Sequence, residues 1–169
     1  TLRQSEEKYR LLINNIPDIT WTTNSEGHTI FISPYVTEVY GYTPEEIYAD
    51  HELWLSRVHT DDIDRVMMAF KSLFIKNEKF NIEYRIQRKD GLWIWLHDRS
   101  FNVREKDGRR YADGLFTDIT GRKRAEEALR ESEEKYRNLV ESVRDVVYTI
   151  DSSGVLTYIS PVVKNTLGY

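Results

Sequence analysis

Two stretches of the chain carry hydrophobic patterns that assign them to regular secondary structure. From residue 80 to 87 apolar and polar side chains alternate, which predicts a β-strand with one buried face. From residue 61 to 76 apolar side chains recur every three or four positions, which predicts a helix that covers a sheet. Its apolar face consists of Ile63, Val66, Met67, Phe70, Leu73 and Phe74.

Turn-forming residues divide much of the remaining chain into strands. Residues 18–24 and 28–33 flank a short segment of small and polar residues, so we expect a hairpin there. Asp90–Gly91 and Asp107–Gly108 are typical of tight hairpin turns. The strands that these two turns would join cover residues 80–87, 92–105 and 110–119. The expected order is helix, two strands, three helices, three strands and helix.

Capping residues mark the starts of two short helices. Ser33 followed by Pro34 predicts an N-cap and a first helical turn, and that helix would stop near Gly41. Thr43 and Glu46 are spaced as a capping box, in which each side chain accepts a hydrogen bond from the other residue's amide. A second short helix is therefore expected directly after Thr43.

The longer helix has a polar first turn. Thr60 is expected to be its N-cap. Asp61 and Asp62 follow, and with Asp64 they could be read as a cation site. We favour the helix dipole as the reason for Asp61 and Asp62, because it stabilises negative charge in a first turn without any ligand. The histidines show no spacing typical of a metal site, so no metal is expected.

An internal repeat determines the domain organisation. Residues 2–42 and 129–169 align without a gap, and 19 of the 41 aligned positions are identical. A tandem array of similar domains is the natural interpretation. We expect the second copy to be truncated, and we expect the array to continue before Thr1 in a longer protein. The expected parts are a linker helix at 1–17, a complete domain at 18–120, an inter-domain linker helix at 121–144, and the start of a second domain at 145–169.

The two linker helices carry a heptad-like stripe of apolar side chains. Leu129, Ser132 and Tyr136 belong to this stripe in the second linker. Such a stripe predicts a homodimer through paired linker helices, and Ser132 would weaken the pairing enough to suit a switch. The alternative is an amphipathic helix that packs only on its own or the neighbouring domain.

The order of elements and several specific residues resemble the PAS family with its C-terminal PAC segment. The resemblance covers essentially all of residues 5–124. Trp54 precedes His59, Thr60, Asp61 and Asp62, which is similar to the family's tryptophan and His-Pro-Asp-Asp motif with threonine in place of proline. The PAC signature resembles Arg85, Arg88, Lys89, Asp90, Gly91, Trp95, Gly114, Asp118, Ile119 and Thr120. The resemblance implies an α+β fold: a five-stranded antiparallel sheet of order 2-1-5-4-3, with short helices on one face around a small pocket and flanking amphipathic helices.

Composition narrows the chemistry that this pocket could perform. The chain has a formal net charge of -4 and lacks a basic cluster, which argues against nucleic acid as a partner. It contains no cysteine, which excludes a cysteinyl-flavin adduct and a thioester-linked chromophore. Haem is not expected, because residues 61–76 contain no histidine and Met67 or Met68 would be weak ligands more suited to core filling. The cofactor stays unknown.

Large aromatic side chains are the candidate lining of a pocket. They either fill the core or surround a small ligand, and strand alternation alone does not decide which face the rings at 93 and 95 take. A noncovalent flavin, another aromatic ligand and an empty core stay open. The pocket candidates are Trp21, Trp54, Met67, Phe70, Tyr84, Trp95 and Phe116. No catalytic motif is visible, so we do not expect an enzyme.

These observations favour a signal-sensing and relay module. Ligand binding or a partner's state would alter the sheet and pass through Asp118, Ile119 and Thr120, where Thr120 is expected to cap the linker helix. The effector, a histidine kinase or diguanylate cyclase in a two-component type of signalling protein, would lie outside this chain. The alternative is a ligand-free adaptor for dimerisation and protein–protein interaction.

Two further expectations concern the surroundings of the fragment. No apolar stretch is long enough to span a membrane, so we expect this fragment to be cytoplasmic without membrane contact, while the longer protein could be anchored. The incomplete hairpin near residues 146–159 would expose apolar faces and open edges. We expect it to pair with another chain or to be poorly ordered.

Overall fold

The computed structural model describes residues 18–142 and 146–164. The chain divides into two compact units, and the boundary between them along the chain falls between Gly121 and Arg122. The predicted N-terminal linker helix at 1–17 lies outside the described residues. Residues 165–169, in the second copy of the repeat, also lie outside the described residues.

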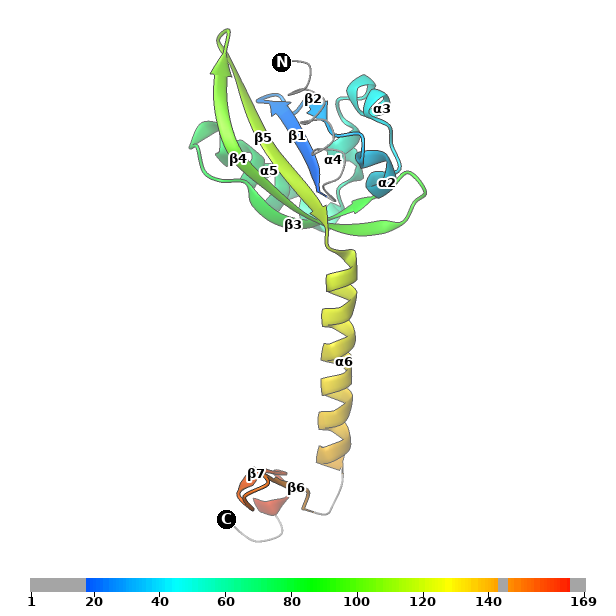
Figure 1. Ribbon diagram of the computed structural model, residues 1–169, viewed down its shortest axis with the longest axis vertical. Helices are drawn as coiled ribbons and strands as arrows, with labels where there is room; N and C mark the ends of the chain where they lie inside the picture. The colour runs from blue at the N-terminus through cyan, green and yellow to red at the C-terminus, as the bar shows by residue number, and fades with distance from the viewer. Residues whose placement is uncertain (1–17, 143–145, 165–169) are drawn as a thin grey trace, which may run out of the picture. The chain divides into compact units, whose positions relative to one another are not determined.

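The first unit is built on a five-stranded antiparallel sheet in the order β2-β1-β5-β4-β3 (Figure 1). Asp107 and Gly108 both have positive φ, 53° and 72°, as the predicted tight turn between β4 and β5 requires. The strands are β1 (Ile19–Asn24), β2 (Thr29–Ile32), β3 (Asn81–Gln87), β4 (Trp93–Lys106) and β5 (Arg109–Asp118). The predicted α+β class and strand order are therefore confirmed.

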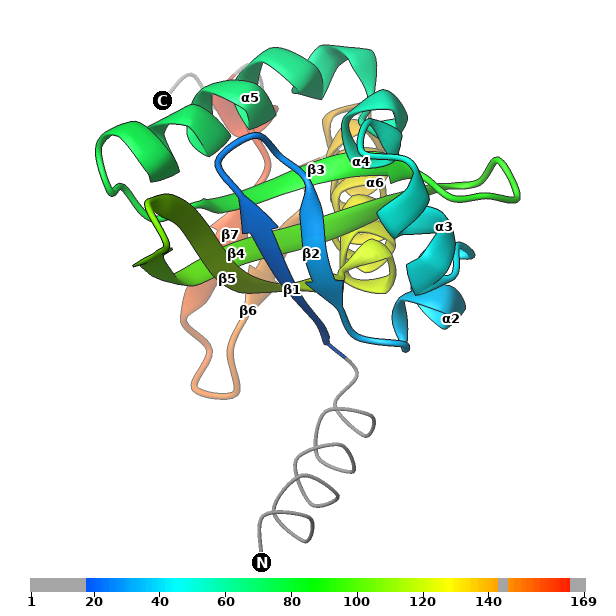
Figure 2. The same ribbon diagram turned by 90° about the horizontal axis from the view of Figure 1, so that it is seen from above.

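Four helices between β2 and β3 cover one side of this sheet. They are α2 (Val36–Tyr40), α3 (Pro44–Ala49), α4 (Leu53–Arg57) and α5 (Thr60–Ile75). In Figure 2, α5 lies along β3 and α3 lies beside β2. The short helices therefore enclose one end of the covered face, and the long helix closes the other.

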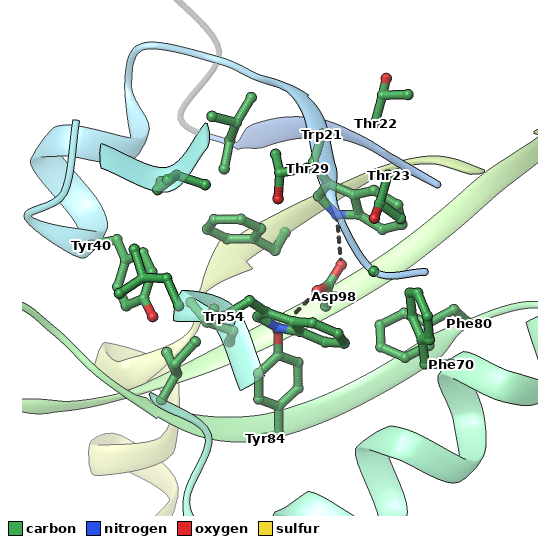
Figure 3. A pocket seen from close by; sticks show the side chains of 17 residues that line it. Trp21, Thr22, Thr23, Thr29, Tyr40, Trp54, Phe70, Phe80, Tyr84 and Asp98 are labelled. Atoms are coloured by element: carbon green, nitrogen blue, oxygen red, sulfur yellow. Dashed lines mark hydrogen bonds between the residues drawn. The ribbon is translucent and has the colours of Figure 1, made fainter. Parts of the chain in front are cut away.

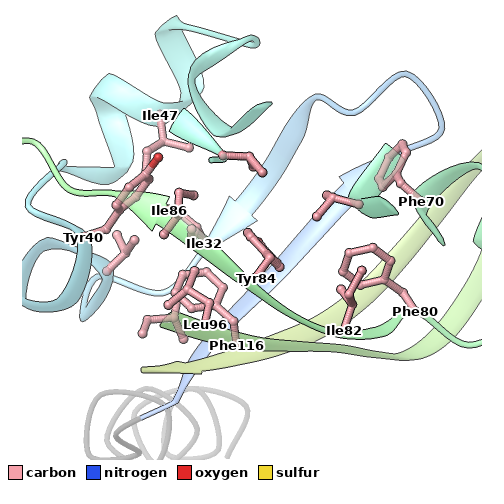
Figure 4. Close-up of a cluster of buried hydrophobic side chains, with 14 of the residues drawn as sticks. Ile32, Tyr40, Ile47, Phe70, Phe80, Ile82, Tyr84, Ile86, Leu96 and Phe116 are labelled. Atoms are coloured by element: carbon pink, nitrogen blue, oxygen red, sulfur yellow. The ribbon is translucent and has the colours of Figure 1, made fainter. Parts of the chain in front are cut away.

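The core lies between the sheet and these helices. The alternation predicted for β3 is present: Ile82, Tyr84 and Ile86 are 8%, 1% and 1% exposed, and their polar neighbours face the other side. Phe70 of α5 belongs to the same buried cluster (Figure 4). Val66 of α5 is a member of it as well. Because each fully buried large apolar side chain contributes about 1.5 to 3 kcal/mol, this cluster is the main source of stability.

Of the four N-caps predicted in this unit, at Ser33, Thr43, Thr60 and Thr120, the one at Thr43 agrees with the structure. The capping box of Thr43 and Glu46 is present in both directions. The cap predicted at Ser33 is wrong: α2 starts at Val36, and the Ser33 hydroxyl instead accepts the Thr20 amide of β1. The predicted stop is confirmed, with a left-handed Gly41 at the C-cap.

The cap of the long helix lies one residue earlier than predicted. His59 is the N-cap of α5, and its ring nitrogen Nδ1 accepts the amide of Asp61. Thr60 is the first residue of the helix. The prediction failed because histidine is a rarer cap than threonine, although its ring nitrogen can accept the same kind of hydrogen bond.

The second unit contains most of helix α6 (Thr120–Ser142) and a two-stranded sheet of β6 (Tyr148–Ile150) and β7 (Leu156–Ile159). The exposure predicted for this hairpin is confirmed, since Tyr148 and Ile150 are 61% and 58% exposed. Leu156 is 51% exposed. Pairing of this hairpin with another chain stays a prediction.

Candidate functional site

A cavity of about 70 Å³ lies in the first unit between the sheet and its helices (Figure 3). Every strand of the sheet and each of the helices α2 to α5 contributes to its wall. The lining residues are Trp21, Thr22, Thr23, Gly27, Thr29, Ile32, Tyr40, Ile47, Leu53, Trp54, Phe70, Phe80, Tyr84, Ile86, Leu96, Asp98 and Phe116. The structure thus brings together the predicted pocket residues Trp21, Trp54, Phe70, Tyr84 and Phe116.

Two predicted pocket residues are not part of this lining. On β4 the residues Ile94, Leu96 and Asp98 are buried, so Trp95 takes the opposite face, where the Arg85 guanidinium carbon lies 5.5 Å from its ring centroid. Met67 of α5 is half-buried outside the cavity wall. The side chain of Met68, the other methionine considered for haem, is 71% exposed.

A buried hydrogen-bond network centres on Asp98, which is 5% exposed. The indole Nε1 of Trp21 donates to Asp98 Oδ1 at 2.8 Å, and the hydroxyl of Tyr84 donates to Asp98 Oδ2 at 2.9 Å. The indole Nε1 of Trp54 in turn donates to the Tyr84 hydroxyl at 2.9 Å, as Figure 3 shows. The Asp98 carboxylate thus joins three strands, and Tyr84 connects helix α4 to them.

The electrostatics of this network are those of a carboxylate removed from water. Burial raises the pKa of Asp98 to about 7, against the lowering effect of the hydrogen bonds from Tyr84 and Trp21. Burial also raises the pKa of Tyr84, and the charge of Asp98 adds to this. Asp98 forms no ion pair with any residue in the described part of the chain. The cavity lining contains no lysine, arginine or histidine either.

A second polar group in the lining is also buried. Tyr40 of α2 is 5% exposed, and its hydroxyl has no hydrogen-bond partner among the described residues. Burial raises the pKa of this hydroxyl, so it stays neutral. A buried hydroxyl without a hydrogen-bond partner lowers the free energy of unfolding by about 1 to 3 kcal/mol. A ligand that bonds to the Tyr40 hydroxyl would remove this cost.

A glycine on β5 positions Trp21. Gly114 lies opposite Trp21 in the β1–β5 register. A Cβ atom at position 114 would come within 2.2 Å of the Trp21 ring and 2.5 Å of the carbonyl oxygen of Arg99. The indole can therefore lie over β5 and reach Asp98 only because residue 114 has no side chain.

The acidic first turn of α5 has a structural partner that the sequence did not reveal. Asp62 is 6% exposed and accepts from the Arg85 amide at 3.0 Å and from Arg85 Nε at 2.9 Å. Burial acts to raise its pKa, but the hydrogen bonds from Arg85 and Arg65 outweigh it and hold the pKa at about 2. Asp62 therefore ties α5 to β3, in addition to its favourable place in the helix dipole.

The predicted relay residues form a hydrogen-bonded junction between β4, β5 and α6. The Ile119 amide donates to the Trp95 carbonyl at 2.9 Å, and the Trp95 amide donates to the Thr120 hydroxyl at 2.9 Å. Asp118 Oδ1 accepts the Thr120 amide at 2.8 Å. The prediction that Thr120 caps the helix is wrong, because it is the first residue of α6 and its hydroxyl bonds to β4 instead.

Sequence reasoning missed Asp98 and Tyr40, the buried acid and the buried unpaired hydroxyl of the cavity. Asp98 had a usable signal, since it alternates with Leu96 on the buried side of β4, where a charged residue is unusual. Tyr40 had none, because its orientation depends on how α2 is placed against the sheet.

A metal-binding cluster and a membrane-spanning helix are both absent from the described residues. No group of three or more acidic, histidine or cysteine side chains lies close enough together there to hold a metal ion. Within residues 18–142 and 146–164, every helix is too short or too polar to cross a membrane.

A sequence profile of the PAS fold matches residues 29–115. The chain belongs to the PAS family. This family assignment agrees with the strand order and with the cavity between sheet and helices. PAS domains are typically non-catalytic sensor domains.

Curated relatives of this PAS chain are sensors. The "Sensor protein FixL" of Bradyrhizobium diazoefficiens is 26% identical over 96% of this chain and 32% of its own length. The "Two-component sensor PprA" of Pseudomonas aeruginosa is 27% identical over 95% of this chain and 18% of its own length. The chain thus spans about a fifth to a third of these relatives. They support a signal-sensing module.

Solved structures give the same result. The sensory box histidine kinase/response regulator from Burkholderia thailandensis superposes with a TM-score of 0.61 and 26% identity, covering 78% of this chain and 98% of that one. The N-terminal domain of a diguanylate cyclase with a PAS/PAC sensor, from Marinobacter aquaeolei, has a TM-score of 0.54 at 23% identity, over 61% of this chain and 95% of its own. At that identity the second likeness supports the fold alone.

Proposed function

We propose that residues 18–120 sense a small ligand in the cavity and pass its presence through the Asp118–Ile119–Thr120 junction to helix α6. The observation that carries this proposal is the cavity itself, which contains a buried carboxylate and an unpaired hydroxyl. A core that served packing alone would gain stability from apolar residues at both positions. Retaining Asp98 and Tyr40 is better explained by ligand binding.

The relay rests on strand β4, which contacts both the cavity and the junction. Asp98 faces the cavity, and Trp95, three residues earlier, bonds to the junction through its amide and carbonyl groups. A ligand that moves Asp98 therefore displaces the strand that holds Ile119 and Thr120. We propose that the signal reaches an effector of the histidine kinase or diguanylate cyclase type outside this chain, because two similar solved structures belong to proteins named for these two enzymes.

Native mass spectrometry of gently purified protein tests the sensing step. We expect a nonprotein mass of low molecular weight that is lost in Asp98→Asn. A chain that carries no such mass, and whose backbone amides at 119–125 exchange equally fast in lysate and in buffer, would contradict ligand sensing.

The relay step is tested at Thr120. Thr120→Val removes the acceptor of the Trp95 amide, and we expect about tenfold faster hydrogen exchange at that amide together with a weaker response of α6 to ligand. Thr120→Ser keeps the hydroxyl and is the matched control. If Thr120→Val responded to ligand like the wild type, the junction would not be the route.

An assembly function is a second candidate, because α6 exposes apolar side chains. Leu129 and Tyr136 lie seven residues apart and are 61% and 60% exposed, as expected for one stripe of a dimeric coiled coil. A second copy of this chain is the proposed partner. In sedimentation, Leu129→Glu with Tyr136→Glu should give monomers. Ala128→Glu with Lys135→Glu, which has the same spacing beside the stripe, should not. Equal association of both variants would reject helix pairing.

A further inference from the structure

The cavity combines a negative charge with aromatic rings and contains no opposite charge. Asp98 is fully surrounded by protein, and its partners Trp21 and Tyr84 are neutral donors. A carboxylate has about four acceptor sites, of which these two side chains and the backbone amide of Arg99 occupy three. The carboxylate is therefore held in place and can still accept a further hydrogen bond.

This composition excludes several classes of ligand. An anion would be repelled by Asp98 and would find no lysine, arginine or histidine in the lining. A bulky ligand does not fit, since a cavity of about 150 Å³ holds one benzene molecule and this cavity measures about 70 Å³. The ligand therefore has fewer non-hydrogen atoms than the six of benzene.

The remaining features favour a positive charge. The rings of Trp54 and Phe70 lie side by side on the cavity wall, with centroids 5.4 Å apart (Figure 3). Aromatic faces attract cations, and they do so most strongly where water is excluded. The buried Tyr40 hydroxyl offers an unused acceptor on the same cavity wall.

We propose that this cavity selects a compact organic cation, an alkylammonium ion with fewer than six non-hydrogen atoms, whose ammonium group bonds to Asp98 and whose alkyl part lies against Trp54 and Phe70. The inference rests on the proposed sensing function and specifies its ligand. The cation supplies the charge that Asp98 lacks, and the rings exclude water from the pair.

Three probes of equal size separate charge from shape: propylammonium, 1-propanol and acetate. Binding is followed by the indole N–H signals of the purified chain in ¹⁵N NMR spectra. Trp21 and Trp54 donate within the cavity network, whereas Trp93 is 45% exposed and serves as an internal control. We expect propylammonium to shift the Trp21 and Trp54 signals with a sub-millimolar Kd, within the limit for so small a ligand.

The expected selectivity follows from the charge. Propylammonium should bind at least about tenfold more tightly than 1-propanol, and acetate should not bind. Asp98→Asn has nearly the same shape and should lower propylammonium affinity by about thirtyfold or more while changing 1-propanol affinity less than about threefold. Equal affinities of propylammonium and 1-propanol would overturn the inference.

A pH titration of propylammonium binding to the wild type also tests whether the charge of Asp98 contributes to affinity, and it needs no variant. The titratable groups that face the cavity with Asp98 are Tyr84 of β3 and Tyr40 of α2, and burial keeps both neutral. The helices α3, α4 and α5 and the strands β1, β2 and β5 place no acid or base on the lining. Propylammonium affinity should therefore fall about thirtyfold from pH 8 to pH 5.5 as Asp98 takes up a proton. A flat profile would contradict the ion pair.

The results with the three probes test the ligand class separately from the sensing function on which it rests. If 1-propanol binds as tightly as propylammonium and both slow hydrogen exchange at Ile119, the sensing function stands and the ligand class is wrong. If no probe binds and the purified chain carries no ligand, both proposals fail. Preferential binding of propylammonium with a slower Ile119 amide supports both.

Discussion

The two copies of the repeated hairpin, β1–β2 and β6–β7, form the same local hydrogen bonds in different surroundings. In the first copy the Ser33 hydroxyl accepts the Thr20 amide at 3.2 Å. In the second, Ser160 accepts the Val147 amide at 3.0 Å, and both serines are completely buried. These bonds occur at equivalent positions of the repeat.

The turns of the two hairpins also agree. Gly27 and Gly154 have positive φ values of 89° and 80°. In each turn one side-chain oxygen, from Asn24 or Asp151, accepts two backbone amides of the loop. The short polar side chain and the glycine therefore determine the turn in both copies, without help from the rest of the fold.

What differs is the third strand. β1 pairs with both β2 and β5, while in the described part of the chain β6 pairs with β7 alone. As a result Ile32 is 6% exposed and its counterpart Ile159 is 39% exposed. Local sequence is thus sufficient for the hairpin, but burial, the cavity and its chemistry depend on strands that come much later in the chain.

The largest effect should come from Asp98, which is on β4 and lies outside the repeated segment 2–42. Its pKa of about 7 in the folded protein exceeds its ordinary value of 3.8. Between these values the unfolded chain releases the proton and the folded chain keeps it. The free energy of unfolding should therefore fall as pH rises from 4 to 7, by on the order of 4 kcal/mol.

Urea unfolding at several pH values measures this decline. Asp98→Asn should remove it, because the amide does not ionise. Asp62 does not interfere, because its pKa of about 2 lies below its ordinary value, so its contribution is lost only below pH 4. A wild-type stability that stays level from pH 4 to pH 7 would show that Asp98 is not the buried acid described above.

The next largest effect concerns the strand that completes the first copy. Gly114→Ala should lower the free energy of unfolding of the first unit by about 3 kcal/mol, because the new methyl group meets the Trp21 ring. The Trp21 indole signal should shift as its bond to Asp98 is lost. Gly121→Ala is the control: its Cβ would contact nothing within 4 Å, and alanine favours a helix.

A smaller effect is expected from the buried serines, which form a matched pair. Ser33→Ala leaves the Thr20 amide without its acceptor and should cost about 1 to 2 kcal/mol of global stability. Ser160→Ala removes the same bond in the second copy but should leave the unfolding of the first unit unchanged and accelerate exchange only near Val147. Equal global losses would mean that the two units unfold together.

Comparison with the sequence shows where local reasoning is sufficient. It predicted the turns, the capping box and the alternation of β3, all of which depend on neighbouring residues. It failed for Ser33 and Thr120, because their hydroxyls bond to residues 13 and 25 positions away. Trp95 was a pocket candidate whose face stayed open, and it does not line the cavity. The alternation of a strand does not show which of its two faces is buried until a helix or a second layer covers one of them.

The candidate site was predicted in composition more than in chemistry. Five of the seven predicted aromatic or apolar residues line the cavity. Large aromatic side chains of a small domain are mostly buried in its core, and the cavity lies within that core. Asp98 was overlooked although it interrupts the apolar face of β4. A charged residue on a predicted buried face therefore deserves the same scrutiny in a sequence as a catalytic motif.

The smallest effect is expected at Ile159, where the two copies have the same residue in different surroundings. Ile159→Thr should change stability by less than about 0.5 kcal/mol, because the side chain is already 39% exposed. Ile32→Thr, its counterpart, should lower the free energy of unfolding by about 2 kcal/mol, since it places a hydroxyl in the core. Urea unfolding of both variants gives the ratio. Similar losses would show that something buries Ile159 in solution, and a second copy of the hairpin, pairing through the open edges of β6 and β7, is the partner to test first.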